Sequence, residues 1–563
     1  MDLFLILMKL SECIMEVVRK ILNSRKLLFC MCIITLVIPN FFLFFTEQIP
    51  LIGRMCNIVL PVSVFWYIMT LGKKPGKIYL WLLLFIFFNA FQLVLLYLFG
   101  NSVIAVDMFL NLVTTNPVEV NELLSNITPA IIYVVIIYVP LLVWSIYSLK
   151  QPVLDIAFRL KQRKYAQYGC CVGMLLLLFS YVFDKNFVLK NDIYPINVMY
   201  NVILAIDREI RVTDYHDTSR DFAFNAMCTH PDSEKELYVL VIGETARAAN
   251  FGLYGYDRNT TPLLESVPDL IVFKDAFSQS NTTHKSVPMI MSAVSAENYD
   301  DIYAQKGIVT AFGEVGYATA FFSNQRRNHS FIDFFGEEAD VCKFVKDELP
   351  QGANISDEAL LNLTKNFLAK STKDKKFIVL HTYGSHFNYT ERYPSRMAYY
   401  KPDKASMASA EHREALVNAY DNSIRATDDF LFRLIKMIEA QGVPSAVLYV
   451  SDHGEDIYDD GRELFLHASP IPSLFQLHVP LLVWTSAEYN RAYPQKQKNL
   501  MRHADMEVST NLAVFHTLLD LAGITTSYKK DYQALSHDNF KPEESRTYLN
   551  DHNKPVPISY LYK

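Results

Sequence analysis

The sequence has few cysteines in its last two thirds. Of eight cysteines in 563 residues, only Cys228 and Cys342 lie beyond residue 184. Disulfides persist in oxidising compartments, and exported domains with small cores depend on them. At most one bridge is available to this region, which must therefore rely on a large core. The sequence does not say whether the two residues meet.

A basic excess is also missing. The chain has 53 Lys and Arg against 59 Asp and Glu, a formal net charge of −6. A surface that follows a nucleic-acid backbone needs clustered positive charge, so we expect no nucleic-acid partner. A cleaved signal peptide is not expected either, because residues 1–26 carry charges through their middle and lack a small-residue cleavage site.

Long apolar runs, by contrast, are concentrated before residue 184. A helix needs roughly 18 to 20 apolar residues to cross the hydrocarbon of a bilayer. These runs predict a transmembrane domain with five spans. We place the spans at about 27–45, 51–71, 78–99, 129–148 and 166–183.

The segments that connect these spans differ in positive charge. Residues 1–26, 72–77 and 149–165 hold five, three and five Lys or Arg, whereas 46–50 and 100–128 hold none. Because positive segments stay in the cytoplasm, the N-terminus is predicted inside. After five crossings, everything beyond residue 184 is then predicted outside the cytoplasmic membrane.

A connector follows the predicted transmembrane domain of residues 1–184. We assign residues 185–225 to this connector and residues 226–563 to an external catalytic domain. Segment 197–211 has the spacing of an amphipathic helix. This helix could lie along the membrane surface, or it could pack on the external domain as an ordinary helix.

In the external domain, short apolar runs alternate with helical patterns, such as 408–441 and 508–522. Strands that are apolar on both faces and alternate with helices are typical of a largely parallel sheet covered by helices. An α/β fold is therefore predicted. The expected strands are 237–242, 317–323, 377–382, 446–450 and 479–484.

Polar residues follow three of these strands, where ligands bind in such sheets. Glu244 follows the first strand, residues 383–386 follow the third, and Asp452 and His453 follow the fourth. Two carboxylates and an imidazole suit zinc or manganese. A lone Glu is more often a helix cap and a lone His a structural residue, but the coincidence at three strand ends favours a metal site. Gly454 is expected to let the chain turn so that both neighbouring ligands reach one ion.

A hydroxyl that such a metal could activate is offered by FSQSNTTHKSVP, residues 277–288. Thr282, Thr283 and Ser286 are all candidates. The segment could also be plain turn chemistry before Pro288. The residues alone do not choose among these possibilities.

Five segments together resemble the motifs of the lipid A phosphoethanolamine transferases, and they occur in the family's order. Members of that family are inner-membrane enzymes with an alkaline-phosphatase-like, sulfatase-type soluble domain. The resemblance covers essentially the whole chain, including five spans before the catalytic domain. The segments are VIGETARAANFGLYGYDRNTTP (241–262), NTTHKSVPM (281–289), LHTYGSHFNYTERYP (380–394), AYDNSIRATDDFL (419–431) and YVSDHGED (449–456).

The resemblance implies a role for each of seven residues in the soluble domain. It implies that Glu244, Asp452 and His453 bind a catalytic Zn²⁺. Thr283 would be the nucleophile and also the fourth zinc ligand. His386 and His467 would bind the substrate phosphate or a second zinc, and they could act on the leaving or entering oxygens as acid, base or metal ligand. His381 is a weaker match of the same kind.

The resemblance also implies a ping-pong reaction. Thr283 would attack phosphatidylethanolamine, release diacylglycerol and carry phosphoethanolamine to a lipid A or lipopolysaccharide acceptor. The enzyme would be a multi-pass protein of the inner membrane with its catalytic domain in the periplasm, and we expect a monomer. Lipid A modification of this kind implies a part in polymyxin resistance.

A further candidate lies between the third and fourth predicted spans, in DMFLNLVTTNPVEVNELL, residues 107–124. It resembles the family segment in which Asn111, Thr115 and Glu119 line the ethanolamine head-group site. An anionic Glu119 could pair with the ammonium group. The same stretch also fits a plain capping arrangement, with Asn116 as N-cap and Pro117 as the first helical residue.

Two positions depart from the family pattern. Family members commonly have a disulfide that flanks the nucleophile, yet Gln279 and Met289 occupy those flanking positions here. The departure leaves open how rigidly the turn at Thr283 is held. It does not affect the predicted zinc ligands.

Three other functions compete with this interpretation. A phosphoglycerol transferase of the lipoteichoic acid synthase type shares the spans, the metal and the threonine, but GSHFNYTERYP and YDNSIRATD favour the ethanolamine family. A sulfatase activity is disfavoured because no Cys-x-Pro-x-Arg or Ser-x-Pro-x-Arg segment lies near residue 283. A catalytically inactive lipid-binding scaffold is disfavoured by the intact ligand set.

Overall fold

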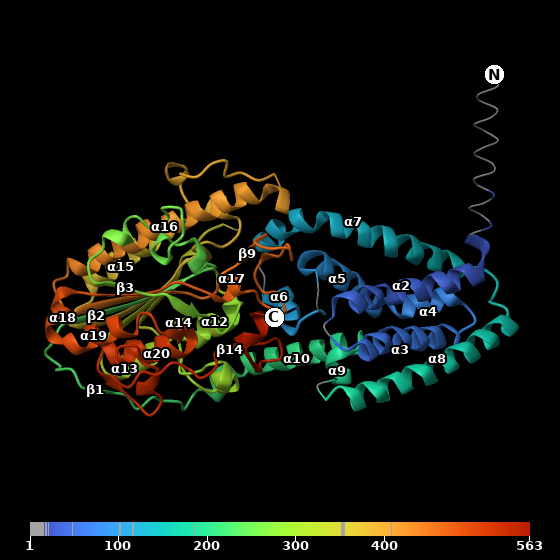
Figure 1. Ribbon diagram of the computed structural model, residues 1–563, viewed down its shortest axis with the longest axis horizontal. Helices are drawn as coiled ribbons and strands as arrows, with labels where there is room; N and C mark the ends of the chain where they lie inside the picture. The colour runs from blue at the N-terminus through green and yellow to red at the C-terminus, as the bar shows by residue number, and fades with distance from the viewer. Residues whose placement is uncertain are drawn as a thin grey trace, which may run out of the picture. The chain divides into compact units, whose positions relative to one another are not determined.

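The computed structural model describes residues 16, 20, 22–47, 49–100, 103–114, 117–185, 187–350, 355–406 and 408–562. The chain divides into two compact units (Figure 1). The first unit comprises residues 1–109 and 124–206, and the second comprises residues 110–123 and 207–563. The first unit is built from apolar helices, and the second is built around a β-sheet.

Four helices of the described chain are long and apolar enough to cross a membrane. A fifth crossing is added if α4 (Pro75–Trp81) and α5 (Leu83–Phe99), which are bent by 67° at their junction, count as one span. Four of the five predicted spans thus correspond to continuous helices, and the third corresponds to the bent pair. The four continuous helices are α2 (Arg25–Thr46), α3 (Leu51–Met69), the segment Thr128–Ser148 of α7 (Pro117–Ser148), and α8 (Ile156–Phe183).

The first unit is apolar outside and partly polar inside. Large apolar side chains such as Phe45 and Val182 are exposed, whereas Asn40 is buried. Asn40 Nδ2 donates hydrogen bonds to the main-chain oxygens of Asn57 at 2.7 Å and Tyr194 at 2.9 Å. Inside a bilayer a polar side chain must find its partners within the protein, so this inverted pattern suits a lipid environment.

The predicted amphipathic helix is present as α10 (Ile196–Thr213), between the short helices α9 (Leu189–Asp192) and α11 (Tyr215–Thr218). One side of α10 is buried, and the other exposes Ile203, Ile206 and Ile210. The division between the two units falls within this helix, after Ile206. The predicted connector is therefore helical along most of its length.

A seven-stranded sheet lies at the centre of the second unit, in the order β3-β11-β8-β2-β7-β5-β6. The five strands from β8 to β6 are parallel, and β11 runs antiparallel to both of its neighbours. The largely parallel sheet is thus confirmed. The strands are β2 (Glu236–Gly243), β3 (Leu270–Phe273), β5 (Ala318–Ser323), β6 (Val341–Phe344), β7 (Lys375–His381), β8 (Ser445–Ser451) and β11 (Leu481–Thr485).

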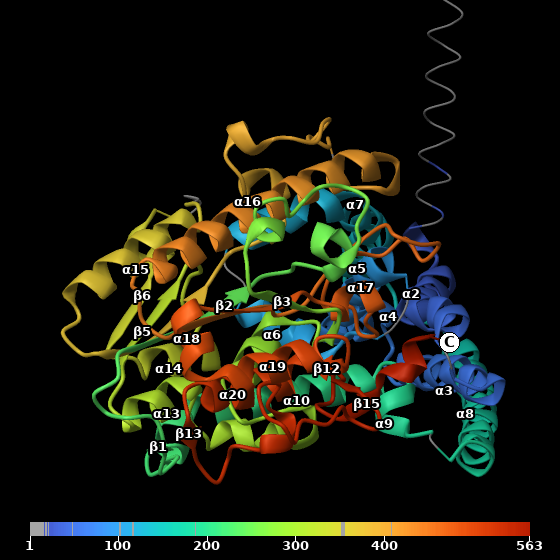
Figure 2. The same cartoon turned by 60° about the vertical axis from the view of Figure 1, so that its left-hand side comes forward.

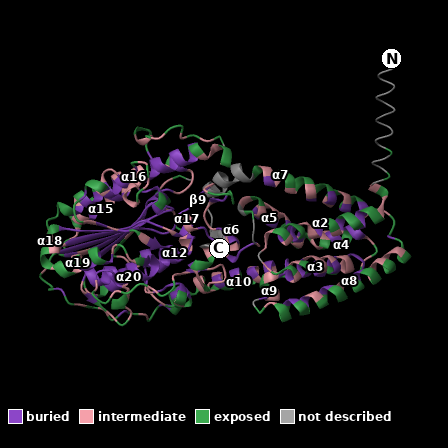
Figure 3. Cartoon of the chain, in the orientation of Figure 1, coloured by how far each residue is buried: buried purple, intermediate pink, exposed green. Residues whose placement is uncertain are grey.

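Helices cover both faces of the sheet, so that every residue of β2 is buried (Figures 1 and 3). Leu240 of β2 packs on one side in a core with α12 (Thr283–Ile290), α13 (Ile308–Glu314), α14 (Phe331–Glu337) and α20 (Thr510–Leu521). Val239 packs on the other side with α15 (Glu358–Lys370) and α16 (Arg413–Glu439). Figure 2 shows α15 and α16 together on one face of the sheet.

Smaller elements complete the second unit. Cys228 and Cys342 are both free cysteines, so within the described residues this unit holds together without a disulfide, through its two cores. The short helices are α17 (Leu474–Leu477), α18 (Ala487–Ala492) and α19 (Pro494–His503). The paired short strands are β1 (Met227–Cys228) with β13 (Ile524–Thr525), β4 (Asp275–Phe277) with β12 (Glu507–Ser509), β9 (Asp456–Ile457) with β10 (Phe465–Leu466), and β14 (Thr547–Leu549) with β15 (Pro555–Pro557).

Candidate functional site

The carboxyl ends of adjacent parallel strands bring three polar segments together. Strand β2 lies between β8 and β7, with Gly243 opposite Ser451 and Ile242 opposite His381. The residues that follow these strands therefore meet at one edge of the sheet. Glu244, Asp452 and His453 are all buried there, and one ligand atom from each lies within 4.8 Å of the others.

The ligand atoms of this cluster lie close to one another. His453 Nε2 lies 3.3 Å from Asp452 Oδ2 and 3.7 Å from Glu244 Oε1. His453 Nδ1 lies 2.8 Å from the main-chain oxygen of Gly454 and donates to it, which leaves a lone pair on Nε2. A cluster of two carboxylates and a neutral imidazole nitrogen matches the ligand preferences of zinc.

Asp452 supplies the observation that most favours a cation. Its Oδ1 accepts from the main-chain N–H groups of Thr245 at 3.1 Å and His453 at 2.7 Å. Its Oδ2 is buried and finds no hydrogen-bond donor among the residues described by the structure. Burial raises the pKa of Asp452 to about 7. A bound cation would take up the second oxygen and offset this cost, so the residues present fit a metal ion.

Thr283 is the hydroxyl that reaches the cluster. Its Oγ1 donates to Glu244 Oε1 at 3.1 Å and lies 3.1 Å from His453 Nε2. The other two candidates are turned elsewhere, since Thr282 Oγ1 lies 3.1 Å from Ser280 Oγ and Ser286 Oγ donates to the main-chain oxygen of Asp452 at 2.6 Å. The side chain of Thr283 is also partly exposed, so a substrate can approach it.

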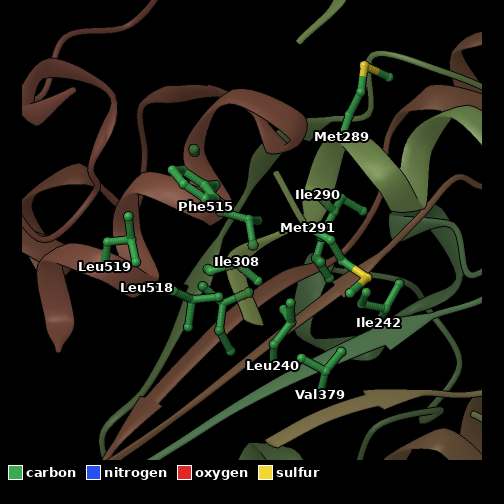
Figure 4. Close-up of a cluster of buried hydrophobic side chains, with 14 of the residues drawn as sticks. Leu240, Ile242, Met289, Ile290, Met291, Ile308, Val379, Phe515, Leu518 and Leu519 are labelled. Atoms are coloured by element: carbon green, nitrogen blue, oxygen red, sulfur yellow. The ribbon is translucent and has the colours of Figure 1, made fainter. Parts of the chain in front are cut away.

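The position of Thr283 is fixed by α12, which begins at this residue. Figure 4 shows Ile290 and Met291, at the end of the helix, beside Leu240 and Ile242 of the central strand. Burying side chains of this size stabilises the helix position by about 1.5–3 kcal/mol each. The apolar end of α12 thus holds its polar start at the metal-ligand cluster.

The two positions that depart from the family pattern are held without a covalent bridge. Gln279 Nε2 donates to the carboxylate of Glu297 at 3.3 Å and to Thr547 Oγ1 at 3.2 Å. The Gln279 main-chain N–H donates to Asn511 Oδ1 at 2.6 Å. Met289 is buried in the core of the unit. Hydrogen bonds and apolar packing therefore brace the turn at Thr283.

Two of the predicted histidines lie beside the cluster. The centroid of the His467 ring is 4.3 Å from that of His453 and 6.0 Å from that of His386. His467 Nδ1 lies 3.2 Å from Glu455 Oε2, and His386 Nδ1 lies 2.6 Å from the main-chain oxygen of Phe387. Since Nδ1 of each ring has a partner, Nε2 is the nitrogen left for a substrate.

His381 has a different place. It is buried, and its Nδ1 lies 3.1 Å from Ser323 Oγ. Its Nε2 lies 3.2 Å from Gln325 Nε2, and Gln325 donates to Glu244 Oε2 at 2.8 Å. His381 is therefore separated from the ligand cluster by Gln325. Sequence reasoning missed Gln325, although it lies two residues beyond a predicted strand; the only signal was that position.

Backbone geometry also shapes the site. Thr245 has a φ of 53°, a left-handed conformation that is uncommon for a threonine and turns the chain after Glu244. Gly384 has a φ of 46°, and a Cβ there would lie 2.7 Å from the main-chain oxygen of Glu244. The role expected for Gly454 needs correction. A Cβ at Gly454 would lie 2.2 Å from the main-chain oxygen of Phe475, so this glycine permits close packing, and its φ is not left-handed.

Two of the three head-group candidates lie in consecutive helices. Asn111 is in α6 (Val106–Thr114), and Glu119 is in α7 (Pro117–Ser148). Thr115 and Asn116 lie outside the described residues. The assignment of Asn111, Thr115 and Glu119 to a head-group site stays a prediction.

Two other groups in the described chain have the composition of a metal site. His230, Glu234 and Glu236 form one of them, at the amino end of β2. Their carboxylates already have donors, since Tyr493 donates to Glu234 at 2.6 Å and Lys375 Nζ lies 3.8 Å from Glu236. The second group faces Lys496 and Lys529 in the same way and consists of Asp520, Asp531 and His537. Internal cations or hydroxyls thus occupy both groups.

Comparisons with known sequences give a family match within the second unit. The sulfatase family model matches residues 236–524. The chain is 29% identical over 305 residues to Kdo(2)-lipid A phosphoethanolamine 7''-transferase of Escherichia coli K12, covering 53% of each chain. It is 30% identical over 312 residues to phosphoethanolamine transferase EptA of the same strain, covering 54% of this chain and 55% of EptA. The matched part thus spans about half the length of these relatives.

Solved structures also resemble the chain. The lipooligosaccharide phosphoethanolamine transferase EptA of Neisseria meningitidis, an integral membrane protein, aligns with a TM-score of 0.71 at 22% identity and covers 91% of this chain and 98% of that one. This likeness shows the fold of both units. The periplasmic domain of EptC from Escherichia coli, in complex with zinc, aligns with a TM-score of 0.54 at 26% identity, covering 60% of this chain and 96% of that domain.

Proposed function

This chain belongs to the sulfatase family, and from that premise we propose that it is a zinc-dependent phosphoethanolamine transferase. It moves phosphoethanolamine from phosphatidylethanolamine to a lipid A or lipopolysaccharide acceptor through a covalent intermediate on Thr283. The observation that carries the proposal is the Thr283 hydroxyl, which lies 3.1 Å from both a carboxylate oxygen of Glu244 and Nε2 of His453. The similarity to a Kdo(2)-lipid A phosphoethanolamine 7''-transferase and to the phosphoethanolamine transferase EptA supports phosphoethanolamine as the transferred group and lipid A as the acceptor class.

Glu244, Asp452, His453 and Thr283 are the residues that would hold the zinc. The unpaired Oδ2 of Asp452 and the lone pair on His453 Nε2 support this assignment, as does the zinc in the related EptC domain. A bound zinc lowers the pKa of a coordinated hydroxyl and offsets charge on phosphoryl oxygens. Gln325 orients the Glu244 carboxylate through its hydrogen bond of 2.8 Å.

The first half of the reaction loads Thr283. Its Oγ1 attacks the phosphorus of phosphatidylethanolamine in line with the bond to diacylglycerol, which breaks as the new bond forms. The hydroxyl proton, held toward Glu244 Oε1 before the attack, ends on the diacylglycerol oxygen. The buried apolar end of α12 keeps Oγ1 in place, so that little orientational freedom is lost in the transition state.

The second half of the reaction unloads Thr283. An acceptor oxygen attacks the same phosphorus as the bond to Oγ1 breaks, and the proton that the acceptor hydroxyl loses, or one from water, ends on Oγ1. His386 and His467 line the approach, each with Nδ1 held by the protein and Nε2 left to contact the entering or leaving oxygen. In this ping-pong scheme, diacylglycerol leaves the site before the acceptor enters.

The apolar helices fit a donor that is itself a membrane lipid. We place the chain in the inner membrane, with the N-terminus in the cytoplasm and the sheet domain in the periplasm, as a monomer. Asn111, Thr115 and Glu119 remain the proposed contacts for the ethanolamine head group. A role in polymyxin resistance follows if the acceptor is lipid A.

Mass spectrometry of lipid A and core oligosaccharide tests this function. Cells that express the wild-type chain should gain one phosphoethanolamine on an acceptor, and cells that express Thr283→Ala should not. Labelled phosphatidylglycerol supplied as donor tests the phosphoglycerol alternative. Normal transfer by Thr283→Ala, or transfer of phosphoglycerol instead, would contradict the proposal.

A further inference from the structure

An exposed aromatic side chain is held in a fixed position on α16. Tyr399 is 69% exposed and lies in the segment that follows β7 and passes over α16 (Figures 1 and 2). Asn422 of α16 is buried, and its Oδ1 accepts from the main-chain N–H groups of Tyr399 at 2.9 Å and Tyr400 at 2.8 Å. Its Nδ2 donates to the main-chain oxygen of Tyr400 at 2.9 Å. Three hydrogen bonds from one buried amide therefore fix the backbone that carries the exposed ring.

Guanidinium groups contact the rings of both tyrosines. Arg425 Cζ lies 4.4 Å from the centroid of the Tyr399 ring, and Arg258 Cζ lies 5.1 Å from that of Tyr400. The two rings meet edge to face, with centroids 5.1 Å apart and planes at 77°. Arg425 Nη1 also donates to the main-chain oxygen of Asn259, which holds its guanidinium in place. Cation–π contacts thus order the tyrosine rings, while most of the surface of Tyr399 stays open to a partner.

The segment around these rings carries more positive than negative charge. Among residues 395–406 the cations Arg396, Lys401 and Lys404 are exposed. The one acid of this segment, Asp403, accepts from the hydroxyl of Tyr393 at 2.9 Å. The acids on neighbouring helices are engaged as well, since Asp421 accepts from Asn250, Tyr256 and Arg258, and Glu358 and Asp429 both pair with Arg433. This surface therefore attracts an anionic partner.

Helix α16 separates this surface from the metal-ligand cluster. Tyr420 donates to the main-chain oxygen of Thr245, next to Glu244, at 2.7 Å. Ser423 Oγ donates to Ser385 Oγ, in the loop after β7, at 2.9 Å. One side of the helix thus contacts the loops of the candidate site. A helix with its side chains is about 10–12 Å across. A molecule that contacts Tyr399 while it reacts at Thr283 must therefore extend about that far from the reacting phosphorus.

We propose that Tyr399, Tyr400 and Arg425 form a platform that binds the anionic oligosaccharide of a lipopolysaccharide acceptor, at a distance from the atom that reacts. The proposal deepens the proposed transferase function and rests on it. A tyrosine offers an apolar ring face to the C–H face of a sugar and a hydroxyl to its oxygens. A guanidinium binds the phosphate or carboxylate groups that an anionic sugar carries.

The composition of the surface favours a sugar over a lipid bilayer. A segment that enters the interface of a bilayer presents a continuous apolar face. Among residues 395–406, Tyr399 is the one exposed large apolar side chain, and the exposed residues around it are polar or charged. A single rigid ring among cations suits a polar, anionic ligand.

The position of the platform determines which step it affects. Contacts with a remote part of the acceptor strengthen acceptor binding, whereas the loading of Thr283 involves the donor alone. Loss of the platform should therefore raise the KM for an acceptor that carries the oligosaccharide. It should not change the KM for an acceptor without the oligosaccharide.

A two-stage assay on the full-length enzyme in detergent micelles tests the platform. Phosphatidylethanolamine alone first loads Thr283, and the loaded enzyme is then chased with lipopolysaccharide or with lipid A that lacks the oligosaccharide. We expect Tyr399→Ala to raise the KM for lipopolysaccharide about tenfold and to leave the KM for lipid A unchanged. Tyr399→Phe keeps the ring and should retain most of the affinity. Tyr532→Ala is the matched control, because Tyr532 is also exposed, at 49%, in the same unit.

Two further measurements separate the sugar from its charge. Oligosaccharide released from lipopolysaccharide should compete with the intact acceptor in the wild type and much less in Tyr399→Ala. Salt should raise the KM of the wild type for lipopolysaccharide more than that of Arg425→Gln.

Four results would overturn the platform. They are an unchanged KM for lipopolysaccharide in Tyr399→Ala, an equal rise for lipid A, a released oligosaccharide that does not compete, and an equal salt dependence in Arg425→Gln. Binding of the wild type to phosphatidylglycerol vesicles that is lost in Tyr399→Ala would assign the surface to a bilayer and overturn it too. Failure of the wild type to load Thr283 would instead overturn the transferase function itself.

Discussion

Gln325 donates a hydrogen bond of 2.8 Å to Glu244 Oε2, although the two residues follow different strands and are 81 positions apart. The same carboxylate accepts from Thr283 through its other oxygen. Replacing Gln325 with Leu should loosen the Glu244 carboxylate, because the hydrogen bond to Oε2 is lost. Partners of this kind typically change metal affinity by about 10- to 100-fold. We therefore expect Gln325→Leu to bind zinc more weakly by a factor in that range, measured by competition with a chelator.

Gln441→Leu provides the control for this change. Gln441 is an exposed amide beyond the end of α16, in the same unit, and contacts Met437 in its own segment. The Gln441→Leu variant should bind zinc with the same affinity as the wild type. Equal zinc affinity in Gln325→Leu and the wild type would show that Glu244 is oriented without this hydrogen bond.

The substitution Asp452→Asn removes the negative charge of this proposed ligand but keeps the size and shape of its side chain. The amide can keep the acceptor oxygen that binds the main-chain N–H groups of Thr245 and His453, but it offers a neutral group at the position of Oδ2. We expect purified Asp452→Asn to retain much less zinc than the wild type, measured by elemental analysis, with its thermal unfolding in the absence of metal unchanged or improved. Full zinc content in the variant would exclude Asp452 as a ligand.

The substitution Thr283→Ser tests whether a hydroxyl at this position is sufficient for phosphoethanolamine transfer. A serine keeps the Oγ that reaches Glu244 but lacks the methyl group that restricts the χ1 rotamer of threonine. We expect the serine variant to transfer phosphoethanolamine at a rate reduced roughly 10- to 100-fold, because orientation contributes to the rate. The alanine variant should fall below detection. Equal rates for both variants, measured with fluorescent phosphatidylethanolamine, would exclude nucleophilic catalysis at this position.

The raised pKa of Glu338 predicts that the free energy of unfolding depends on pH, separately from any effect of the candidate site. Burial raises its pKa to about 7, although Gly307 N–H at 2.9 Å and Thr310 Oγ1 at 2.8 Å donate to it. The unfolded carboxyl titrates near roughly 4.3, so between these values the folded state holds the extra proton. Stability therefore falls as pH rises from about 4.5 to 7, by about 1.4 kcal/mol for each unit of pKa difference.

Glu338→Gln should remove this fall, because the amide does not titrate. Its Tm in detergent should exceed that of the wild type by more at pH 8 than at pH 5. Glu544→Gln, at an exposed position, should follow the wild type throughout. Parallel Tm profiles for wild type and Glu338→Gln would contradict the assigned pKa.

The strands and most ligands could be predicted because burial on both faces leaves a clear pattern. The apolar run 237–242 became β2 with its bounds extended by one residue at each end, and the acids that end such a run are conspicuous. Strand direction leaves no such pattern. The run 479–484 is as apolar as its neighbours, yet β11 is antiparallel, and composition gives no sign of the bend between α4 and α5.

The remaining features depend on contacts between distant segments. The sequence offers three hydroxyl residues that look equivalent, Thr282, Thr283 and Ser286. Only Thr283 begins α12 and contacts Glu244 and His453, and the sequence does not show these contacts. The contact of Gln325 with Glu244 could not be predicted either, because it depends on the pairing of β5 with β7.

We propose that a metal ion held by this cluster makes Thr283 the carrier of phosphoethanolamine, and peptide mass spectrometry can detect the loaded threonine itself. The full-length enzyme is incubated with phosphatidylethanolamine and no acceptor, either with zinc or after chelation, and is then digested. We expect one phosphoethanolamine on Thr283 with zinc and none after chelation. A zinc-independent adduct, or an adduct on any other residue, would contradict it.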